Sequence, residues 1–223
     1  MTELKQMSGD EFVTKILAGE RDFRRIRLQQ GYNFNSHEGF NELRDYIAKF
    51  GDDLREHPLN LIGSALLNVK AKGLSFQHIK ASASYFNESS FSNCKFYEAD
   101  FANAHLKNIQ WPYAQLYNVD FRSADLRDAN LEHSKLSQVD LRDANLSGAI
   151  LRGANLYGKT NLEGANFARA VLEDADLTHA QNLQHARGLS SAHFLNTRIS
   201  RADVSVCKQA LKREYLVYKG LFE

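Results

Sequence analysis

The sequence is poor in several features that would point to particular kinds of protein. Its 223 residues include only two cysteines and two prolines, and 28 basic against 27 acidic side chains give a net charge of +1. So balanced a charge gives no sign of a strongly charged partner. The first nineteen residues contain Glu3, Asp10 and Glu11 and no apolar core of signal-peptide length. No apolar run reaches the roughly eighteen residues of a membrane span. These absences predict a cytoplasmic protein without a membrane segment.

What the sequence does contain is a five-residue period. A Leu or Phe stands at every fifth residue from Phe86 to Leu156, with Trp111 as the single exception, and the series resumes at Leu162 after a shift of one residue. We call these the centre residues. A small residue, usually Ala, stands two places before most of them. On an α-helix, steps of five residues turn by about 500° and form no apolar stripe, so a helix is excluded.

In extended chain the centre residue and the small residue point to the same side, and the two remaining residues of each five must turn a corner. Four such sides close a coil of twenty residues, and coils stacked about 4.8 Å apart form a solenoid with Leu and Phe inside. Overpacking a small place in so narrow a section should cost about 1–3 kcal/mol. Cys94 takes one of these places, which predicts a buried thiol rather than a disulfide partner.

The repeated segments resemble one family. Residues 124–128, 129–133 and 144–148 read AlaAspLeuArgAsp, AlaAsnLeuGluHis and AlaAsnLeuSerGly, which is similar to the A(D/N)LXX consensus of the pentapeptide-repeat family. The resemblance covers roughly residues 81–204. It implies an all-β solenoid, a right-handed quadrilateral β-helix. The handedness and the square section come from the resemblance and not from the spacing.

Segments outside the period predict helices near both ends of the solenoid. A capping-box spacing begins at Ser8, and the amphipathic stretch after it ends near Ala18. Between residues 36 and 50 the apolar residues recur at three and four, which predicts a helical insertion at 36–57. The predicted division is 1–58 for the N-terminal capping helix, a first partial coil (23–28) and the insertion, 59–204 for the pentapeptide-repeat β-helix, and 205–223 for a C-terminal helix over 205–219.

Adding twenty residues repeatedly maps the outer surface of the coils. One column contains Asp100, Asp120 and Asp140, and Arg122 and Arg142 form a second column on the same side. One interpretation is a ladder of solvated, mutually neutralising charges, with a few tenths to about 1 kcal/mol per pair. The other interpretation is a binding face.

A column of tyrosines lies on the neighbouring side. It contains Tyr97, Tyr117, Ser137 and Tyr157. Tyr combines polar reach with a large apolar area at a small entropic cost, which suits a contact with another protein. Stacked rings that only cover the coil surface are the alternative, and the sequence leaves both open.

Trp111 breaks the period. It takes a centre place, with Ile109 two places before it and Pro112 directly after it, and these residues are larger or stiffer than the pattern requires. A local bulge is therefore expected. The bulge is either a packing irregularity only, or it pushes Trp111 and Tyr113 outward near the tyrosine column to form an aromatic patch. Both residues are candidates for an interaction surface.

No catalytic, cofactor or metal site is predicted. Residues 153–160 satisfy the GxxxxGK[ST] expression of phosphate-binding loops, but such a loop needs a buried strand before it and a helix after it, and here repeats surround it. The eight histidines are scattered without the spacing of zinc ligands. A stacked rod with a filled interior also offers no cleft in which reacting groups converge. An enzyme is therefore not expected.

The outer surface is then the part of the molecule left for function. The first hypothesis is a non-enzymatic protein–protein interaction module, a rigid regulatory or scaffolding rod that binds another protein and neither nucleic acid nor a membrane. A homodimer through Val217, Tyr218 and Leu221 of the C-terminal helix is a further expectation. The resemblance implies an alternative, because some family members mimic DNA and bind DNA gyrase, a topoisomerase. Residues 81–204 carry 14 acidic and 12 basic side chains, a balance of −2, which is a weak charge for that role.

Overall fold

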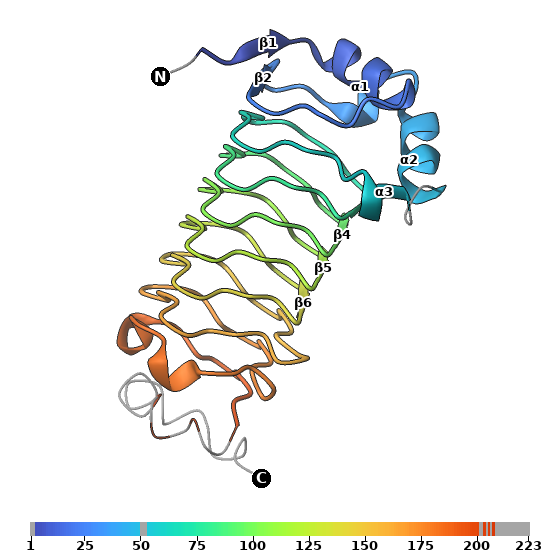
Figure 1. Ribbon diagram of the computed structural model, residues 1–223. Coiled ribbons are helices and arrows are strands. Elements are labelled where there is room, and N and C mark those ends of the chain that lie inside the picture. Colours follow the sequence, from blue (N-terminus) through green and yellow to red (C-terminus); the bar gives the residue numbers. More distant parts are fainter. Residues whose placement is uncertain (1–2, 50–52, 201–202, 204, 206, 208–223) are drawn as a thin grey trace.

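The protein is a rod of stacked four-sided coils with a cap at its N-terminal end (Figure 1). The computed structural model describes residues 3–49, 53–200, 203, 205 and 207. One side of the rod is a parallel sheet of β3 (Ser75–Gln77), β4 (Lys95–Tyr97), β5 (Gln115–Tyr117) and β6 (Lys135–Ser137). Neighbouring strands pair at twenty-residue intervals, such as Phe96 with Leu116. Isolated bridges join the other sides, at the same interval from Asn60 to Asn155. The predicted right-handed quadrilateral β-helix is confirmed.

The direction of each side chain explains the five-residue period. From Phe86 to Leu156 every centre residue points inward and is at most 5% exposed. The small residues are buried beside them, and where Ser replaces Ala its hydroxyl donates to a backbone carbonyl, as Ser89 does to Leu66 O at 2.7 Å. Two places after a centre residue the backbone has a positive φ, for example 58° at Asn103. Asn, Asp and Gly adopt this conformation most readily. Each side of the coil thus needs one large, one small and one turn residue.

The interval between paired residues of successive coils varies along the rod. Asp140 pairs with Asn161, twenty-one residues later, which confirms the predicted one-residue shift. Farther along, Val171 pairs with His193 at an interval of twenty-two residues. Two short 3₁₀ helices occur in this part, η2 (Leu183–His185) and η3 (Leu189–Ser191). The parallel ladder continues through these changes, because the extra residues are taken up between the bridges.

Two strands and three helices form the N-terminal cap. They are β1 (Lys5–Met7), α1 (Gly9–Leu17), β2 (Ile26–Leu28), α2 (Phe40–Lys49) and α3 (Asp53–Glu56), with a 3₁₀ turn η1 (Phe34–Ser36) before α2. Ser8 Oγ accepts a hydrogen bond from Glu11 N at 3.0 Å, which confirms the predicted start of the first helix. β2 belongs to the first partial coil, because Arg27 pairs with Ala65. The helical insertion is confirmed, although α2 begins at Phe40. β1, which pairs with β2, was not predicted.

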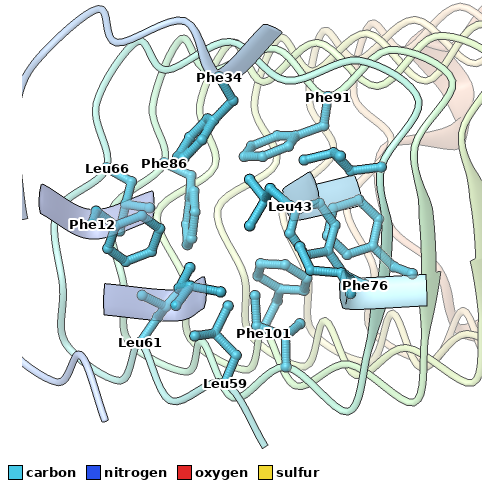
Figure 2. A pocket seen from close by; sticks show the side chains of 15 residues that line it. Phe12, Phe34, Leu43, Leu59, Leu61, Leu66, Phe76, Phe86, Phe91 and Phe101 are labelled. Carbon is cyan, nitrogen blue, oxygen red and sulfur yellow. The ribbon is translucent and has the colours of Figure 1, made fainter. Parts of the chain in front are cut away.

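The cap meets the coils around a small void (Figure 2). Two centre places of the first coils hold Ala71 and Ala81 instead of Leu or Phe. α2 adds Leu43 and Ile47 to this space, and α1 adds Phe12. A cavity of about 30 Å³ remains, and all the side chains that line it are apolar. The junction between cap and coils is therefore held by apolar packing.

The predicted helix over 205–219 and the predicted dimer contact of Val217, Tyr218 and Leu221 lie outside the described residues. Cys207 is described and is buried, as Cys94 is, and neither thiol forms a disulfide. Burial raises the pKa of each thiol to about 12. The interpretation of Cys94 as a small buried residue is confirmed.

Candidate interaction surface

The sheet β3–β6 presents one side of the rod to solvent. The middle residue of each three-residue strand points inward, so the first and third residues point outward. Because the strands are stacked in register, the outward residues form two columns. One column is Ser75, Lys95, Gln115 and Lys135, and the other is Gln77, Tyr97, Tyr117 and Ser137. We call the outward residues of β4, β5 and β6, together with Tyr157 of the next coil, the tyrosine face.

Three tyrosines are the largest side chains of the tyrosine face. Tyr117 and Tyr157 are each 40% exposed, and Tyr97 is half-buried. The ring centres of Tyr97 and Tyr117 lie 6.3 Å apart, and Gln138 Nε2 donates a hydrogen bond to the Tyr117 hydroxyl at 3.2 Å. Ser137 stands between Tyr117 and Tyr157 and is buried. The structure thus places two of the tyrosines side by side and separates the third from them.

Two lysines of the tyrosine face were not singled out from the sequence. Lys95 and Lys135 are exposed, and neither forms an ion pair with any residue that the structure describes. The sequence contains a signal for these lysines, because Lys135 follows Lys95 by two steps of twenty residues, the same spacing that relates the tyrosines. At the neighbouring corner, Glu98 is already bound by Arg55 of α3 at 3.4 Å and His78 at 3.3 Å. The uncompensated charge of the face is therefore positive.

The next side of the rod carries the aspartate ladder of Asp100, Asp120 and Asp140 with Arg122 and Arg142. Backbone bridges join the three aspartates in one column. Arg122 donates to Asp120 at 2.6 Å, and Arg142 donates to Asp140 at 2.6 Å. Burial alone would raise the pKa of Asp140, but the hydrogen bonds and charge of Arg142 hold it below its usual value. Asp100 accepts a backbone hydrogen bond at 2.9 Å. These contacts favour the interpretation as mutually neutralising ion pairs.

Trp111 does not belong to the surface. Its side chain is fully buried, and its ring centre lies 5.4 Å from that of Phe96 and 5.5 Å from that of Phe101. The bridges on both sides of Gln110 keep the twenty-residue spacing, so the predicted bulge is absent. The section has room for the indole because small residues such as Ala114 stand beside it. The outward placement of Trp111 is therefore wrong.

Tyr113 is on the surface but outside the tyrosine face. It stands at a corner with φ of 60° and is 55% exposed. Its ring stacks on His133 with a centroid distance of 5.1 Å. Tyr85 forms a similar stack on His105, at 4.4 Å. The described contacts of Tyr113 therefore join it to the next coil, and no aromatic patch with Trp111 is formed.

The described residues include no group of three or more His, Cys, Asp or Glu side chains arranged to hold a metal ion. Within the same part of the chain, no helix has both the length and the apolar character needed to cross a membrane.

Stacked coils with a filled interior and a polar outside define the class of β-solenoid repeat proteins. The sequence model for pentapeptide repeats matches eight copies, in residues 75–109, 124–158 and 159–187. The chain belongs to the pentapeptide-repeat family. Among curated proteins none matches the sequence.

Several solved structures resemble the chain at low sequence identity. QnrB1, a plasmid-mediated fluoroquinolone resistance protein, is 16% identical, with 68% of this chain and 96% of that chain covered and a TM-score of 0.36. Rfr23 from the cyanobacterium Cyanothece 51142 is 19% identical, with coverages of 61% and 88% and a TM-score of 0.32. HetL from the cyanobacterium Nostoc sp., a protein involved in heterocyst differentiation regulation, is 21% identical, with coverages of 86% and 94% and a TM-score of 0.25. These values are too low to say anything about the function of this chain.

Proposed function

We propose that the protein is a non-enzymatic rod that binds another protein through its tyrosine face, in a regulatory or scaffolding role. The observation that carries this proposal is the combination, on one side of the rod, of Tyr97, Tyr117 and Tyr157 with Lys95 and Lys135, which form no ion pair within the described part of the chain. Tyrosine is enriched in protein interfaces and among the residues that dominate their binding energy. Stacked strands hold these side chains on a rigid backbone, so little conformational freedom is lost on binding.

The packing of the interior supports a role for the outer surface. Centre and small residues fill the coils and are almost entirely buried. The void under the cap is about 30 Å³ and has an apolar lining. Small-molecule sites are typically about 300–1,000 Å³ and contain several convergent polar groups. The interior therefore does not have the size or chemistry of a substrate site.

A pull-down identified by mass spectrometry tests the proposal. The bait is the full-length protein, and the comparison is a variant in which Tyr97, Tyr117 and Tyr157 are all replaced by Ala. The matched control is Tyr113→Ala, because Tyr113 is 55% exposed but lies outside the tyrosine face. We expect the native protein and the control to capture the same partner and the triple variant to lose it. Capture that the triple variant retains would exclude the tyrosine face as the contact.

Imitation of DNA, with binding to DNA gyrase or another topoisomerase, has less support. A DNA mimic needs a dense array of uncompensated negative charge, as the phosphate backbone has. Here the carboxylates of Asp120 and Asp140 are bound by Arg122 and Arg142. In a gyrase supercoiling assay with stoichiometric protein we expect neither inhibition nor protection from a quinolone. Either effect would place DNA mimicry first.

We further propose a cytoplasmic location, which suits the reduced thiols of Cys94 and Cys207. The proposal keeps the division into a cap (1–58), a rod (59–204) and a C-terminal helix (205–223).

Light scattering of the full-length protein and of a Val217→Asp variant measures the dimer expected from the C-terminal helix. A native mass equal to that of one chain, 25.3 kDa, would exclude this dimer.

A further inference from the structure

A groove lies on the outside of the rod next to the cap, at the corner where the side that carries the aspartate ladder ends. Its lining comes from β1 and the residues before it, from the first partial coil, and from the two coils that follow. The volume of the groove is about 1230 Å³. Pockets for small molecules are typically about 300–1,000 Å³. We call this feature the N-terminal groove, and its size suits a segment of polypeptide.

Small outward residues explain why the surface is hollow here. Ala65 stands in a column that continues along the rod with Tyr85 and His105. Gly63 and Ala83 occupy corner places at which the later coils carry larger polar residues. The side chains that would fill the surface at this level are therefore missing, while large side chains stand on both sides of the gap.

The walls of the N-terminal groove are unusually apolar for the outside of this rod. Ile62 and Leu67 directly follow centre residues, a place that holds Arg122 and Arg127 in later coils, and both are partly exposed. Tyr85 is 41% exposed. One face of its ring is stacked on His105, with the two rings inclined by only 2°. The ring is thus held in place beside the groove, whose floor includes the buried Ala65.

The charges of the N-terminal groove are mostly unpaired and mostly positive. Arg25 and Arg27 line it, are exposed, and form no ion pair with any residue in the described part of the chain. Their neighbour Arg24, outside the groove, is bound by Asp22 at 2.6 Å. Glu3 is the only acidic residue of the lining. Two guanidinium groups beside an apolar surface are suited to a ligand that has both carboxylates and apolar groups.

We propose that the N-terminal groove binds a short acidic segment of another protein. Carboxylates of the segment pair with Arg25 and Arg27, and an apolar side chain of the segment packs against Ile62, Leu67 and the exposed part of Tyr85. A basic segment would meet two like charges, and a purely apolar one would leave both guanidinium groups without partners. The site is separate from the tyrosine face and does not depend on the function proposed for that face.

Random peptides of about ten residues, which span about 33 Å when extended, can be displayed on phage and selected on the full-length protein. We expect the selected peptides to be rich in Asp, Glu and apolar residues. The Arg25→Glu/Arg27→Glu variant should weaken their binding about tenfold or more. Ala65→Tyr should do the same without changing charge, because it fills the groove with a residue that the same column already accepts at Tyr85.

Two controls separate the N-terminal groove from other surfaces. Arg122→Glu/Arg142→Glu makes the same change of charge on the aspartate ladder and should leave peptide affinity unchanged. The triple alanine variant of the tyrosine face should also bind the selected peptides normally. Circular dichroism verifies that each variant is folded.

Three results would overturn the proposal. One is a selection that gives no binder or gives basic peptides. Another is unchanged affinity in the folded Ala65→Tyr variant. The third is a native dimer that Ala65→Tyr converts to a monomer in light scattering, because the groove would then be occupied by a second copy of this chain.

Discussion

Replacing Leu43 by Ala tests whether the helical insertion is part of the core of the rod. Leu43 belongs to α2, is 1% exposed, and lies among the centre residues of the first coils, near Phe86 and Phe91 (Figure 2). If α2 were attached only to the surface, truncating this side chain would have a small effect. We expect Leu43→Ala to lower the free energy of unfolding by about 4 kcal/mol.

This magnitude combines two effects. The substitution removes three buried carbon groups, and at about 0.8 kcal/mol each this gives about 2.4 kcal/mol. The space left behind adds about 24 cal/mol per Å³, so an added volume of about 60 Å³ contributes about 1.5 kcal/mol. The surrounding Leu and Phe side chains have not collapsed into the void of about 30 Å³ that already exists here. We therefore expect most of the added volume to remain open.

Urea unfolding followed by two signals measures the effect. Far-ultraviolet circular dichroism reports the whole chain, and the fluorescence of Trp111, the single tryptophan, reports the coils. The ring centre of Trp111 lies 6.3 Å from that of Phe91 and 5.4 Å from that of Phe96, and both phenylalanines line the void. Both signals should therefore shift together. The control Arg142→Ala, which removes a partly exposed ion pair, should cost less than about 1 kcal/mol. A loss for Leu43→Ala no larger than that of the control would refute a shared core.

Three further changes test other parts of the structure. Ala129→Leu overpacks a fully buried small place and should lower the free energy of unfolding by about 1–3 kcal/mol in the same urea titration; an unchanged midpoint would mean that the section has spare room. Because burial raises the pKa of Cys94 and Cys207 to about 12, both thiols should stay protonated and unreactive toward DTNB near neutral pH, and both should react after denaturation. A thiol that reacts rapidly in the folded protein would contradict the burial. The hydrogen bond from Arg127 lowers the pKa of Asp125 below its ordinary 3.8, so the stabilisation by this pair is present above pH 3.8 and is lost as the pH falls through the lower folded value. In thermal melts, Asp125→Asn should be less stable than the native protein near neutral pH, by less than about 1 kcal/mol, and the difference should vanish in acid; a difference independent of pH would rule out this linkage.

The sequence was sufficient to predict the solenoid because each residue of the five has one physical requirement. A large residue fills the section, a small one leaves room for it, and a turn residue takes a positive φ, so a single period encodes both burial and direction. Residues twenty apart are then neighbours by construction, and Tyr97 does pair with Tyr117. The one-residue shift near Lys159 was visible for the same reason, since it displaces every later centre residue.

Features that depend on more than one side of a coil could not be predicted in this way. The bulge at Trp111 was expected from the size of its immediate neighbours, but the volume of the section is shared by four sides, and other small places of this coil hold buried alanines, Ala104 and Ala114. The strand β1 has three residues, too few to show a period, and it forms because β2 offers an unpaired edge. The N-terminal groove also needs Arg25 and Arg27 of the first partial coil, and the helical insertion separates these from the next coil, so that Arg27 pairs with Ala65 at an interval of thirty-eight residues and not twenty.

The distribution of paired and unpaired charges decides which basic residues of the rod are available to a partner. Where Asp directly precedes a centre residue and Arg directly follows it, as in Asp120-Phe-Arg122 and Asp140-Leu-Arg142, one carboxylate binds both the backbone N–H and the guanidinium of that Arg. Such an Arg would have to give up these bonds before it could bind anything else. Lys95 and Tyr97 stand on either side of the centre residue Phe96, where the two segments just named have Asp and Arg. Lys95 therefore has no acidic partner of this kind, and it could bind a partner without first breaking an ion pair. Within a rod whose interior is fixed by packing, we therefore propose that a partner is bound by basic side chains outside such acidic–centre–basic sides, as on the tyrosine face and in the N-terminal groove.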